Sequence, residues 1–585
     1  MMDDSMLRAR RLQIVLAIVA LAAASIAVWD LVTDGFFFHV LGIRVSSREA
    51  YKPFRIALLT VVAIIQLNDW QSPPAGVSWN VLARWARWIA LGATIASMAL
   101  AFRYGIFAAG GADAYGYVSQ AQLFARGQLS APDPLAAVAT TVGHSAAPLG
   151  YQLSRTPGRI VPTYPAGLPI TMAAAIVLGG ETAAYLVIPL FAGATVWLTY
   201  LLGVRIADAR AGLIAAILVT FSPIFVFQSL EPMSDVPVTA WWLLAWYLAL
   251  AARTGAAFGA GACVSAAVLT RPNLAPLAAV LAVVIASQDR GVRRGLAFIA
   301  GALPGCLAVA ALNAFWYGSP LTSGYGELGD LYLASRAIPN LRNYWSWLIE
   351  LETGVILLAA AAPFVARDRR TAGAMLLFCV SLLACYLFYF VYDTWPFLRF
   401  LLPGIPLLLV LVSAVIVAIF ERLPLTLRGT MVFLICILAP ITYLVTANRL
   451  HVFDIQRSER RYVSVGEYID AALPEKAVVL TVIQSGSVRL YGRRPTLRWD
   501  QLPPERLDQT LDGLRAAGYV PYLLLESWEE DLFRTRFATS SRVGNIDWQP
   551  VIEYYGPISV RVFCPDDRQA YMSGRRVLPR AIPYP

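Results

Sequence analysis

The stretch that decides the fold is Ala183 to Val204, AAYLVIPLFAGATVWLTYLLGV, which contains no charged side chain and is followed by Arg205 and Arg210. A helix needs about 20 apolar residues to cross the roughly 30 Å hydrocarbon core of a bilayer. Because loops on the inner face of membrane proteins collect arginine and lysine, the two arginines predict that this helix runs from the outside to the inside.

Similar apolar blocks recur along the 585-residue chain, which is 58% hydrophobic and only 14% charged. Soluble domains carry about 25% charged residues, and their helices interrupt apolar runs with a polar stripe. The pattern predicts a polytopic α-helical membrane protein with about thirteen transmembrane helices. The net charge of +10 lies mostly in short loops between the blocks, which indicates membrane topology rather than binding to nucleic acid.

The loop charges divide the chain into three parts. Residues 1–84 are expected to hold two added spans, roughly 12–29 and 55–68, with an interfacial segment between them. Residues 85–446 are expected to form the main transmembrane region, and residues 447–585 to follow it on the outer face. This topology places the N-terminus in the cytoplasm.

The outer face is expected to carry most of the polar structure. The main transmembrane region has two long outer loops, at 104–182 and 313–346. The C-terminal part has the composition of a soluble domain, with buried strands expected at 477–483 and 519–525. Strands that alternate with helical patterns predict a small extracytoplasmic α/β domain.

The sequence lacks the motifs of enzymes that bind soluble nucleotides. It contains no P-loop and no Gly-x-Gly-x-x-Gly between a strand and a helix. Five of its six cysteines lie in apolar blocks, and no Cys-x-x-Cys pair is present. No nucleotide cofactor is therefore expected, and a substrate held in the membrane fits the architecture better.

Carboxylates gather in the loops that are expected to face outward. Asp113 follows two glycines after the third span, and Glu231 and Asp235 occupy one short loop, Glu-Pro-Met-Ser-Asp. In a helix, a spacing of four residues would place the latter two on the same face. Such carboxylates can serve as a general base or as ligands of a divalent cation. Acidic residues also favour helix N-termini and solvated loops without any catalytic role.

Two arginines lie beside apolar runs. Arg271 separates two short spans, and Arg399 begins another. A charge near membrane depth is costly and is a functional candidate, and a guanidinium can bind phosphate with two hydrogen bonds. The alternative is that both side chains extend to the interface. Arg155 and Arg159 of the first outer loop are further candidates for substrate binding, and a solvated loop explains them equally well.

Several short motifs follow one another between about residues 85 and 420: Ala-Asp-Ala-Tyr (112–115), Tyr-Pro-Ala-Gly-Leu-Pro (164–169), Glu-Pro-Met-Ser-Asp (231–235), Thr-Arg-Pro-Asn (270–273), Tyr-Gly-Ser-Pro (317–320) with Ser-Gly-Tyr-Gly (323–326), and Arg-Phe-Leu-Leu-Pro (399–403). In this order they resemble the GT-C superfamily of membrane glycosyltransferases. That superfamily includes the protein O-mannosyltransferases and the aminoarabinose transferase of lipid A.

The resemblance implies an inverting enzyme that moves a sugar from a polyprenyl-phosphate donor to a glycan, lipid or protein of the cell envelope, on the outer face. It implies that Asp113 is the catalytic base that deprotonates the acceptor hydroxyl. Arg271 or Arg399 would bind the lipid phosphate. The motif residues Tyr164 and Tyr325 are further substrate-binding candidates.

Two departures from the family pattern concern the acidic residues. The mannosyltransferases have Asp-Glu where this chain has Asp113-Ala114. The oligosaccharyltransferases have an Asp-x-Asp type of element, whereas three residues separate Glu231 from Asp235 here. The resemblance assigns these two carboxylates to substrate or to a divalent cation, and the departures leave the need for a metal open.

Two other functions remain compatible with the sequence. A transporter or flippase of a lipid-linked saccharide would need a polar pathway through the spans, which carry few ionisable residues. A non-catalytic scaffold of an envelope synthesis complex would need no cavity near Asp113.

Overall fold

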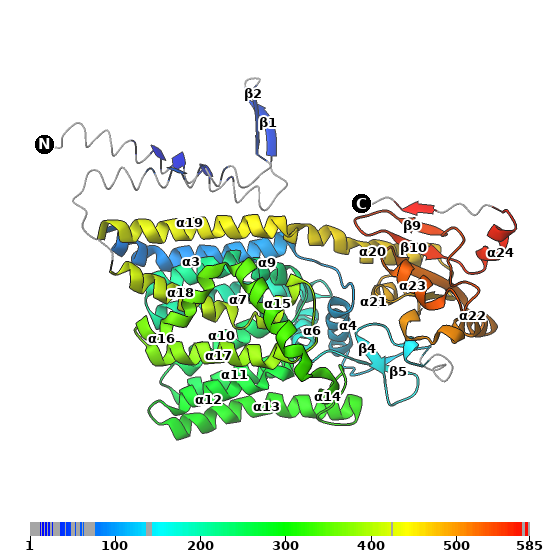
Figure 1. Ribbon diagram of the computed structural model, residues 1–585, viewed down its shortest axis with the longest axis horizontal. Helices are drawn as coiled ribbons and strands as arrows, with labels where there is room; N and C mark the ends of the chain where they lie inside the picture. The colour runs from blue at the N-terminus through cyan, green and yellow to red at the C-terminus, as the bar shows by residue number, and fades with distance from the viewer. Residues whose placement is uncertain are drawn as a thin grey trace.

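The computed structural model consists of a large helical body and a smaller C-terminal α/β part that lie side by side (Figure 1). It describes residues 77–135, 143–422, 425–575 and 580–582, together with a hairpin and isolated positions before residue 77. The hairpin pairs β1 (Phe36–Val40) with β2 (Ile43–Ser47), inside the segment that was expected to be interfacial. The two predicted N-terminal spans fall largely outside the described residues.

The helical body is built mainly from long apolar helices joined by short turns. In chain order its helices are α3 (Val77–Tyr104), α7 (Ala183–Ile206), α8 (Ala209–Phe221), α9 (Pro223–Leu230), α10 (Asp235–Ala249), α11 (Thr254–Thr270), η3 (Pro272–Leu277), α12 (Ala278–Ala286), α13 (Gly291–Tyr317), α14 (Leu328–Leu331), η4 (Ala334–Arg336), α15 (Ala337–Glu352), η5 (Gly354–Ala361), α16 (Ala362–Val365), α17 (Arg369–Leu387), η6 (Trp395–Leu401), α18 (Ile405–Phe420) and α19 (Leu425–Arg449).

Four of these helices are long and apolar enough to cross a membrane unaided, namely α3, α7, α13 and α17. Four bent pairs also qualify if each counts as one span, which gives up to 8 spans among the described residues. The predicted count of about thirteen is not confirmed. The reason is that several apolar blocks form short or broken elements: α15 meets η5 at 103°, and η6 meets α18 at 80°. A proline stands at the first or second position of η3 and of η6, where its missing N–H costs no hydrogen bond.

Close helix packing in the body depends on small residues. Gly261 of α11 lies against the backbone of Phe298 in α13, and Gly301 of α13 lies against the backbone of Phe258 in α11. A Cβ atom at either glycine would overlap the facing carbonyl oxygen. Small residues at such crossings let two backbones approach closely, which is the usual basis of helix association in membranes.

The first long loop forms a compact structure at the end of the body that faces the C-terminal part. It contains α4 (Asp113–Ala125) and α6 (Gly167–Gly179), together with a small antiparallel sheet of order β3-β5-β4. The strands are β3 (Ala131–Pro132), β4 (Tyr151–Leu153) and β5 (Arg159–Pro162), and a short η2 (Gly143–Ala146) precedes β4. Helix α4 begins at Asp113, and α6 is shorter than the helices that are long enough to cross a membrane.

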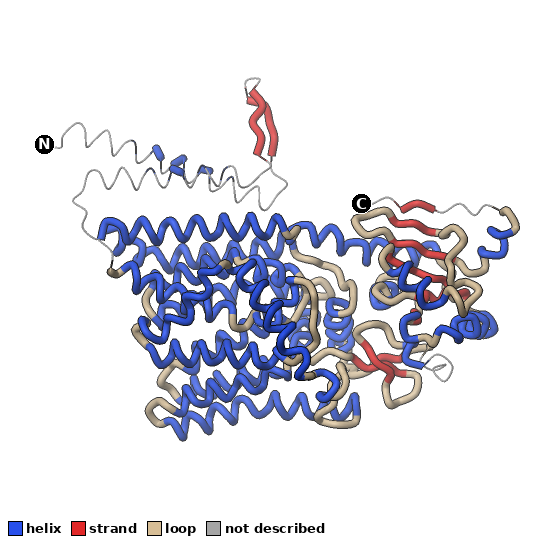
Figure 2. Tube along the Cα trace, in the orientation of Figure 1, coloured by secondary structure: helices blue, strands red, loops and turns tan. Residues whose placement is uncertain are grey.

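The C-terminal part is built around a six-stranded sheet of order β11-β9-β10-β8-β6-β7, seen at the right of Figure 2. Strand β8 pairs in parallel with β6 and antiparallel with β10. The strands are β6 (Ala477–Leu480), β7 (Thr496–Leu497), β8 (Val520–Glu526), β9 (Ile552–Tyr554), β10 (Val560–Phe563) and β11 (Arg580–Ile582). The helices are η7 (Val452–Asp454), α20 (Ile455–Ala472), α21 (Ser485–Leu490), η8 (Trp499–Gln501), η9 (Pro504–Arg506), α22 (Leu507–Ala516), α23 (Glu529–Phe537) and α24 (Asp567–Met572).

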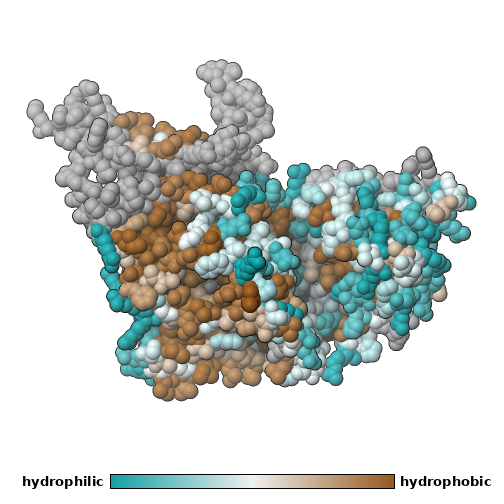
Figure 3. Space-filling model, viewed as in Figure 1, coloured by the Kyte–Doolittle hydropathy of each residue, from teal (hydrophilic) through white to brown (hydrophobic). Residues whose placement is uncertain are grey.

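The surface differs between the two parts. In Figure 3 apolar residues dominate the described surface over the helical body, and hydrophilic residues dominate the surface of the C-terminal part. Exposed Leu303, Leu307 and Phe315 on α13 are part of the apolar surface. Soluble proteins rarely expose a continuous apolar surface of this kind, so the helical body is the membrane-embedded region of a multi-pass protein.

Candidate active site

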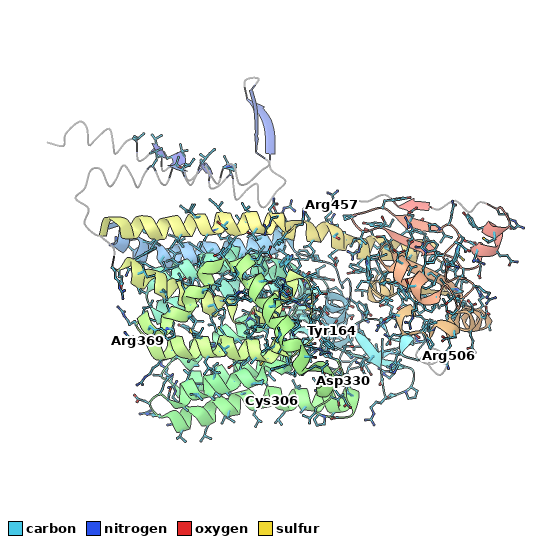
Figure 4. All side chains as sticks on the ribbon, in the orientation of Figure 1. Tyr164, Cys306, Asp330, Arg369, Arg457 and Arg506 are labelled. Carbon is cyan, nitrogen blue, oxygen red and sulfur yellow. The ribbon has the colours of Figure 1, made fainter. Side chains whose placement is uncertain are left out.

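A cavity of about 380 Å³ opens at the end of the helical body that meets the first loop. Figure 4 places Tyr164, one of its lining residues, between the helices and the C-terminal part, whereas Arg369 lies at the opposite end of the body. Four charged residues among the predicted site residues, from four separate segments, line this cavity: Asp113, Asp235, Arg271 and Arg399. Their sequence positions are far apart, so only the fold brings them together. We call this space the first cavity.

Asp113 is the first residue of α4, where the positive end of the helix dipole favours a carboxylate. One of its oxygens, Oδ1, accepts a hydrogen bond from the hydroxyl of Tyr164 at 2.5 Å. The other, Oδ2, accepts from Nη2 of Arg399 at 3.0 Å. Both oxygens are thus engaged, and the Asp113 side chain still keeps 31% exposure toward the cavities.

A second ion pair lies deeper in the first cavity. Nη2 of Arg271 donates to Oδ1 of Asp235 at 2.6 Å, and Asp235 is fully buried. The other nitrogens of Arg271 donate to Ser234 Oγ at 3.2 Å and to the Tyr386 hydroxyl at 3.3 Å. Tyr117 completes the cluster, because its hydroxyl donates to Ser234 at 3.0 Å. Asp235 therefore fixes the position of Arg271 in this structure.

A second cavity of about 300 Å³ lies on the other side of the Asp113–Arg399 pair. It shares Asp113, Met233 and Arg399 with the first cavity, so these side chains form the wall between the two spaces. Of these two cavities, Glu231 lines the second and not the first. The shared wall gives Asp113 access to both sides.

The expectation that Glu231 and Asp235 share a helical face is wrong. Glu231 has extended backbone angles, with φ −101° and ψ 141°, and closes α9, whereas α10 begins only at Asp235. Pro232 follows Glu231 directly and favours this extended backbone. The two carboxylates therefore point into different cavities. Burial raises the pKa of Glu231 to about 8, with Arg399 opposing the shift and Glu459 adding to it.

The two glycines before Asp113 are explained by the C-terminal part. A Cβ atom at Gly110 would overlap the ring of Tyr462 on α20. Gly111 has φ +59°, a left-handed conformation that glycine adopts without strain. The N–H of Ala109 donates to the hydroxyl of Tyr491 at 2.8 Å. The C-terminal part thus packs directly on the turn that presents Asp113.

Among the remaining predicted site residues, only the tyrosines lie at the site. Tyr325 lines the first cavity, with its ring edge-on to that of Tyr164 at 5.9 Å. Arg159 instead donates to Ser130 through Nε at 2.8 Å, and Arg155 lies beside Gly318. Neither arginine lines either described cavity, so the geometry gives their predicted substrate role no support.

The expected divalent cation has no matching ligand set within the described residues. No group of three or more His, Cys, Asp or Glu side chains there is arranged to hold a metal ion. Asp235 is occupied by Arg271, and Glu231 points into the other cavity. The two predicted metal ligands therefore do not fit a shared cation.

Sequence reasoning missed several polar residues that the fold adds to the site. Among them are Tyr117, Gln228, Tyr386 and Glu459. Gln228 and Tyr386 lie inside apolar helices, where a polar residue is a signal that could have been used. Glu459 belongs to the polar helix α20, in which nothing distinguishes it from its neighbours in the sequence.

Residues 166–316 match the family model of the dolichyl-phosphate-mannose-protein mannosyltransferases. This segment carries Asp235, Arg271 and much of the wall of the first cavity. No curated protein matches the sequence.

Solved structures share the fold at low identity. ArnT from Cupriavidus metallidurans bound to undecaprenyl phosphate has a TM-score of 0.53 and 12% identity, covering 83% of this chain and 98% of that one. Its apo state gives a TM-score of 0.51 with the same identity and coverage. The apo oligosaccharyltransferase of Archaeoglobus fulgidus gives a TM-score of 0.48 at 12% identity, over 80% of this chain and 73% of that one. The resemblance to the GT-C superfamily is confirmed, and the family model together with the fold points to a glycosyltransferase.

Proposed function

We propose that the protein is an inverting glycosyltransferase that takes its sugar from a polyprenyl-phosphate donor and transfers it to a cell-envelope acceptor on the outer face of a bacterial inner membrane. The observation that carries the proposal is the convergence of Asp113, Arg271 and Arg399 on one cavity at the end of the apolar body. A general base and cationic groups near a leaving phosphate are what this transfer requires.

The first cavity suits the donor. Its wall on the α13 side includes Val309, Leu312 and Trp316, which offer an apolar surface to a prenyl chain. Arg271 and Arg399 supply positive charge at the polar end. A structural neighbour was solved with undecaprenyl phosphate, which supports a lipid phosphate as the ligand class here.

Arg399 can link donor binding to the activation of Asp113. Arg399 holds Oδ2 of Asp113, and its Nε has no hydrogen-bond partner within the described part of the chain. A donor phosphate in the first cavity attracts this guanidinium, because phosphate offers several acceptor oxygens and a full negative charge. The shift frees Oδ2 to act as a base and places a cation beside the leaving group.

The transfer then balances without another reactant. The acceptor hydroxyl loses its proton to Oδ2 of Asp113, and its oxygen forms a bond to the anomeric carbon from the face opposite the phosphate. The bond between the anomeric carbon and the phosphate oxygen breaks, and polyprenyl phosphate leaves with the electron pair beside Arg399. Tyr164 keeps the Asp113 carboxylate in place through its hydrogen bond to Oδ1.

The proposed sidedness follows the loop charges. Arg205 and Arg210 mark one end of α7 as cytoplasmic, and both cavities lie toward the opposite end of the body. The C-terminal part is then extracytoplasmic. Single cysteines introduced at exposed Arg506 and Arg369 of a cysteine-free variant test this placement in intact cells. A membrane-impermeant maleimide should label only the first, and labelling of Arg369→Cys alone would reverse the orientation.

The activity test uses the full-length protein in lipid nanodiscs with a panel of radiolabelled undecaprenyl-phosphate sugars and an envelope extract as acceptor. At least one donor should yield a labelled acceptor together with free undecaprenyl phosphate. The product should carry the anomeric configuration opposite to that of the donor. Movement of the donor across liposomes without any glycosyl product would favour the flippase alternative instead.

A further inference from the structure

The second cavity contains polar side chains that have no role in binding the proposed donor. Gln228 lines it and is completely buried, at 0% exposure. Neither the amide nitrogen nor the amide oxygen of Gln228 has a hydrogen-bond partner among the described residues. A buried amide left unpaired costs on the order of 1–3 kcal/mol, so this side chain indicates a ligand or water that supplies both a donor and an acceptor.

Two carboxylates from different parts of the protein complete the polar lining. Glu231 comes from the turn between α9 and α10, and Glu459 comes from α20, at the start of the C-terminal part. Glu459 also accepts a hydrogen bond from Arg461 Nη1 at 2.9 Å, which holds it in position. The C-terminal part therefore supplies a residue to the cavity that borders Asp113.

The apolar lining includes two aromatic rings. Phe227 and Phe397 line the cavity beside the polar groups. Aromatic rings next to carboxylates and an amide suit a sugar, because its C–H faces pack on the rings and its hydroxyls both donate and accept hydrogen bonds. A sugar hydroxyl can donate a charge-assisted hydrogen bond to a carboxylate, and it can both donate to and accept from the Gln228 amide.

The charges argue against an anionic acceptor. Only one arginine, Arg399, lines this cavity, and its charge is matched by Asp113. An acceptor phosphate would bring a further negative charge close to Glu459 and Asp113, which like-charge repulsion disfavours. In the first cavity the charges of Arg271 and Arg399 balance those of Asp235 and Asp113, so a donor phosphate meets no further carboxylate among the described residues there.

We propose that the second cavity is the acceptor subsite and binds a neutral sugar unit of the acceptor, with Gln228, Glu231 and Glu459 holding its hydroxyls and Asp113 reaching the hydroxyl that reacts. This inference rests on the proposed function, because it assigns Asp113 as the base. It commits the acceptor to a glycan without phosphate at the site of transfer. It also makes the C-terminal part a component of the acceptor site through Glu459.

The test measures binding of small probes to the full-length protein in nanodiscs by saturation-transfer NMR. The probes are neutral methyl glycosides of mannose, glucose, galactose and arabinose, with glucose 1-phosphate as the charged comparison. At least one neutral glycoside should bind, and glucose 1-phosphate should not bind measurably. Glu459→Gln replaces a charge-assisted hydrogen bond by a neutral one and Gln228→Leu deletes the amide hydrogen bonds, so either variant should weaken binding of that glycoside about fivefold.

Glu467→Gln is the matched control, because Glu467 is exposed on the same helix two turns after Glu459. It should leave glycoside binding unchanged. Glu459→Gln keeps the test valid if Gln228→Leu fails to fold, since Glu459 is 24% exposed. The proposal is overturned if no neutral glycoside binds, if glucose 1-phosphate binds as well as the glycosides, or if Glu459→Gln binds them as the wild type does.

Undecaprenyl phosphate binding, measured on the same preparations by native mass spectrometry, separates this inference from the proposed function. Binding of the lipid phosphate that persists while no glycoside binds removes the acceptor assignment and leaves the glycosyltransferase proposal standing. Absence of both lipid phosphate binding and sugar transfer removes the proposed function itself.

Discussion

The two cavities on either side of Asp113 are similar in size, at about 380 and 300 Å³. They differ in the charged side chains that line them. The first is lined by Arg271 and Arg399 and by apolar side chains of α13. The second is lined by Glu231, Glu459 and an unpaired amide. One wall, made by the Asp113–Arg399 ion pair, separates them. Under the proposed function, the fold places one carboxylate between an anionic donor on one side and a neutral acceptor on the other.

The largest expected effect on sugar transfer comes from Asp113→Asn. This substitution removes the proposed base and keeps the size of the side chain. Sugar transfer should fall by about 10³-fold, the usual contribution of a general base. Binding of undecaprenyl phosphate should persist, because Arg399 is no longer held by a carboxylate. Turnover is measured as labelled acceptor formed per minute under saturating donor. Wild-type turnover in this variant would show that the wall contains no base.

The stability of the protein should depend on Asp235, the buried partner of Arg271 in the first cavity. Asp235→Ala leaves Arg271 buried without its counter-charge, and removing one member of a buried pair costs about 3–5 kcal/mol. The apparent unfolding temperature in detergent should drop sharply. The double variant Asp235→Leu with Arg271→Met removes both charges and should recover much of that loss. A single variant as stable as the wild type would show that Arg271 has another partner.

Much of the fold could be predicted from the sequence because the bilayer imposes a length on each apolar block. The membrane-embedded character and the strands expected at 477–483 and 519–525 follow from local pattern. The number of spans does not, since a block such as the one before Ala286 is split by Pro272 and Pro276 into short pieces. Composition alone cannot tell a straight span from a broken one.

The candidate site was predicted only in part, for a similar reason. Asp113, Asp235, Arg271 and Arg399 stand out because charges beside apolar blocks are costly. Their pairing depends on contacts between residues as far apart as Asp113 and Arg399, which no local pattern encodes. Glu459 was missed because it lies on a helix that is polar throughout.

A smaller effect on sugar transfer is expected from a substitution at Gly110, where the C-terminal part packs on the turn before Asp113. In Gly110→Ala the new methyl group overlaps the Tyr462 ring, and such overpacking costs about 1–3 kcal/mol. Transfer should fall because the turn before Asp113 shifts. Adding Tyr462→Ala removes the overlap and should restore part of the activity. Gly295→Ala is the control, since nothing lies within 4 Å of its Cβ position in α13 and alanine is the better helix former.

The smallest effect concerns pH and the second cavity. Burial raises the pKa of the Glu231 carboxyl from 4.5 to about 8, with Asp113, Asp235 and Glu459 adding to the shift and Arg399 opposing it. The folded state therefore holds this proton more tightly than the unfolded chain does. The resulting stabilisation is full below about pH 4.5 and is lost as the pH rises through about 8.

Glu231→Gln removes this dependence, because the amide carries no proton that the fold could retain. Between pH 6 and pH 9 the apparent unfolding temperature of the variant should fall less than that of the wild type, as followed by tryptophan fluorescence. Glu467→Gln, exposed on α20, should behave as the wild type does. Parallel curves for Glu231→Gln and the wild type would mean that Glu231 is ionised throughout this range. The second cavity would then carry its full negative charge, and the electrostatic contrast with the first cavity would be larger still.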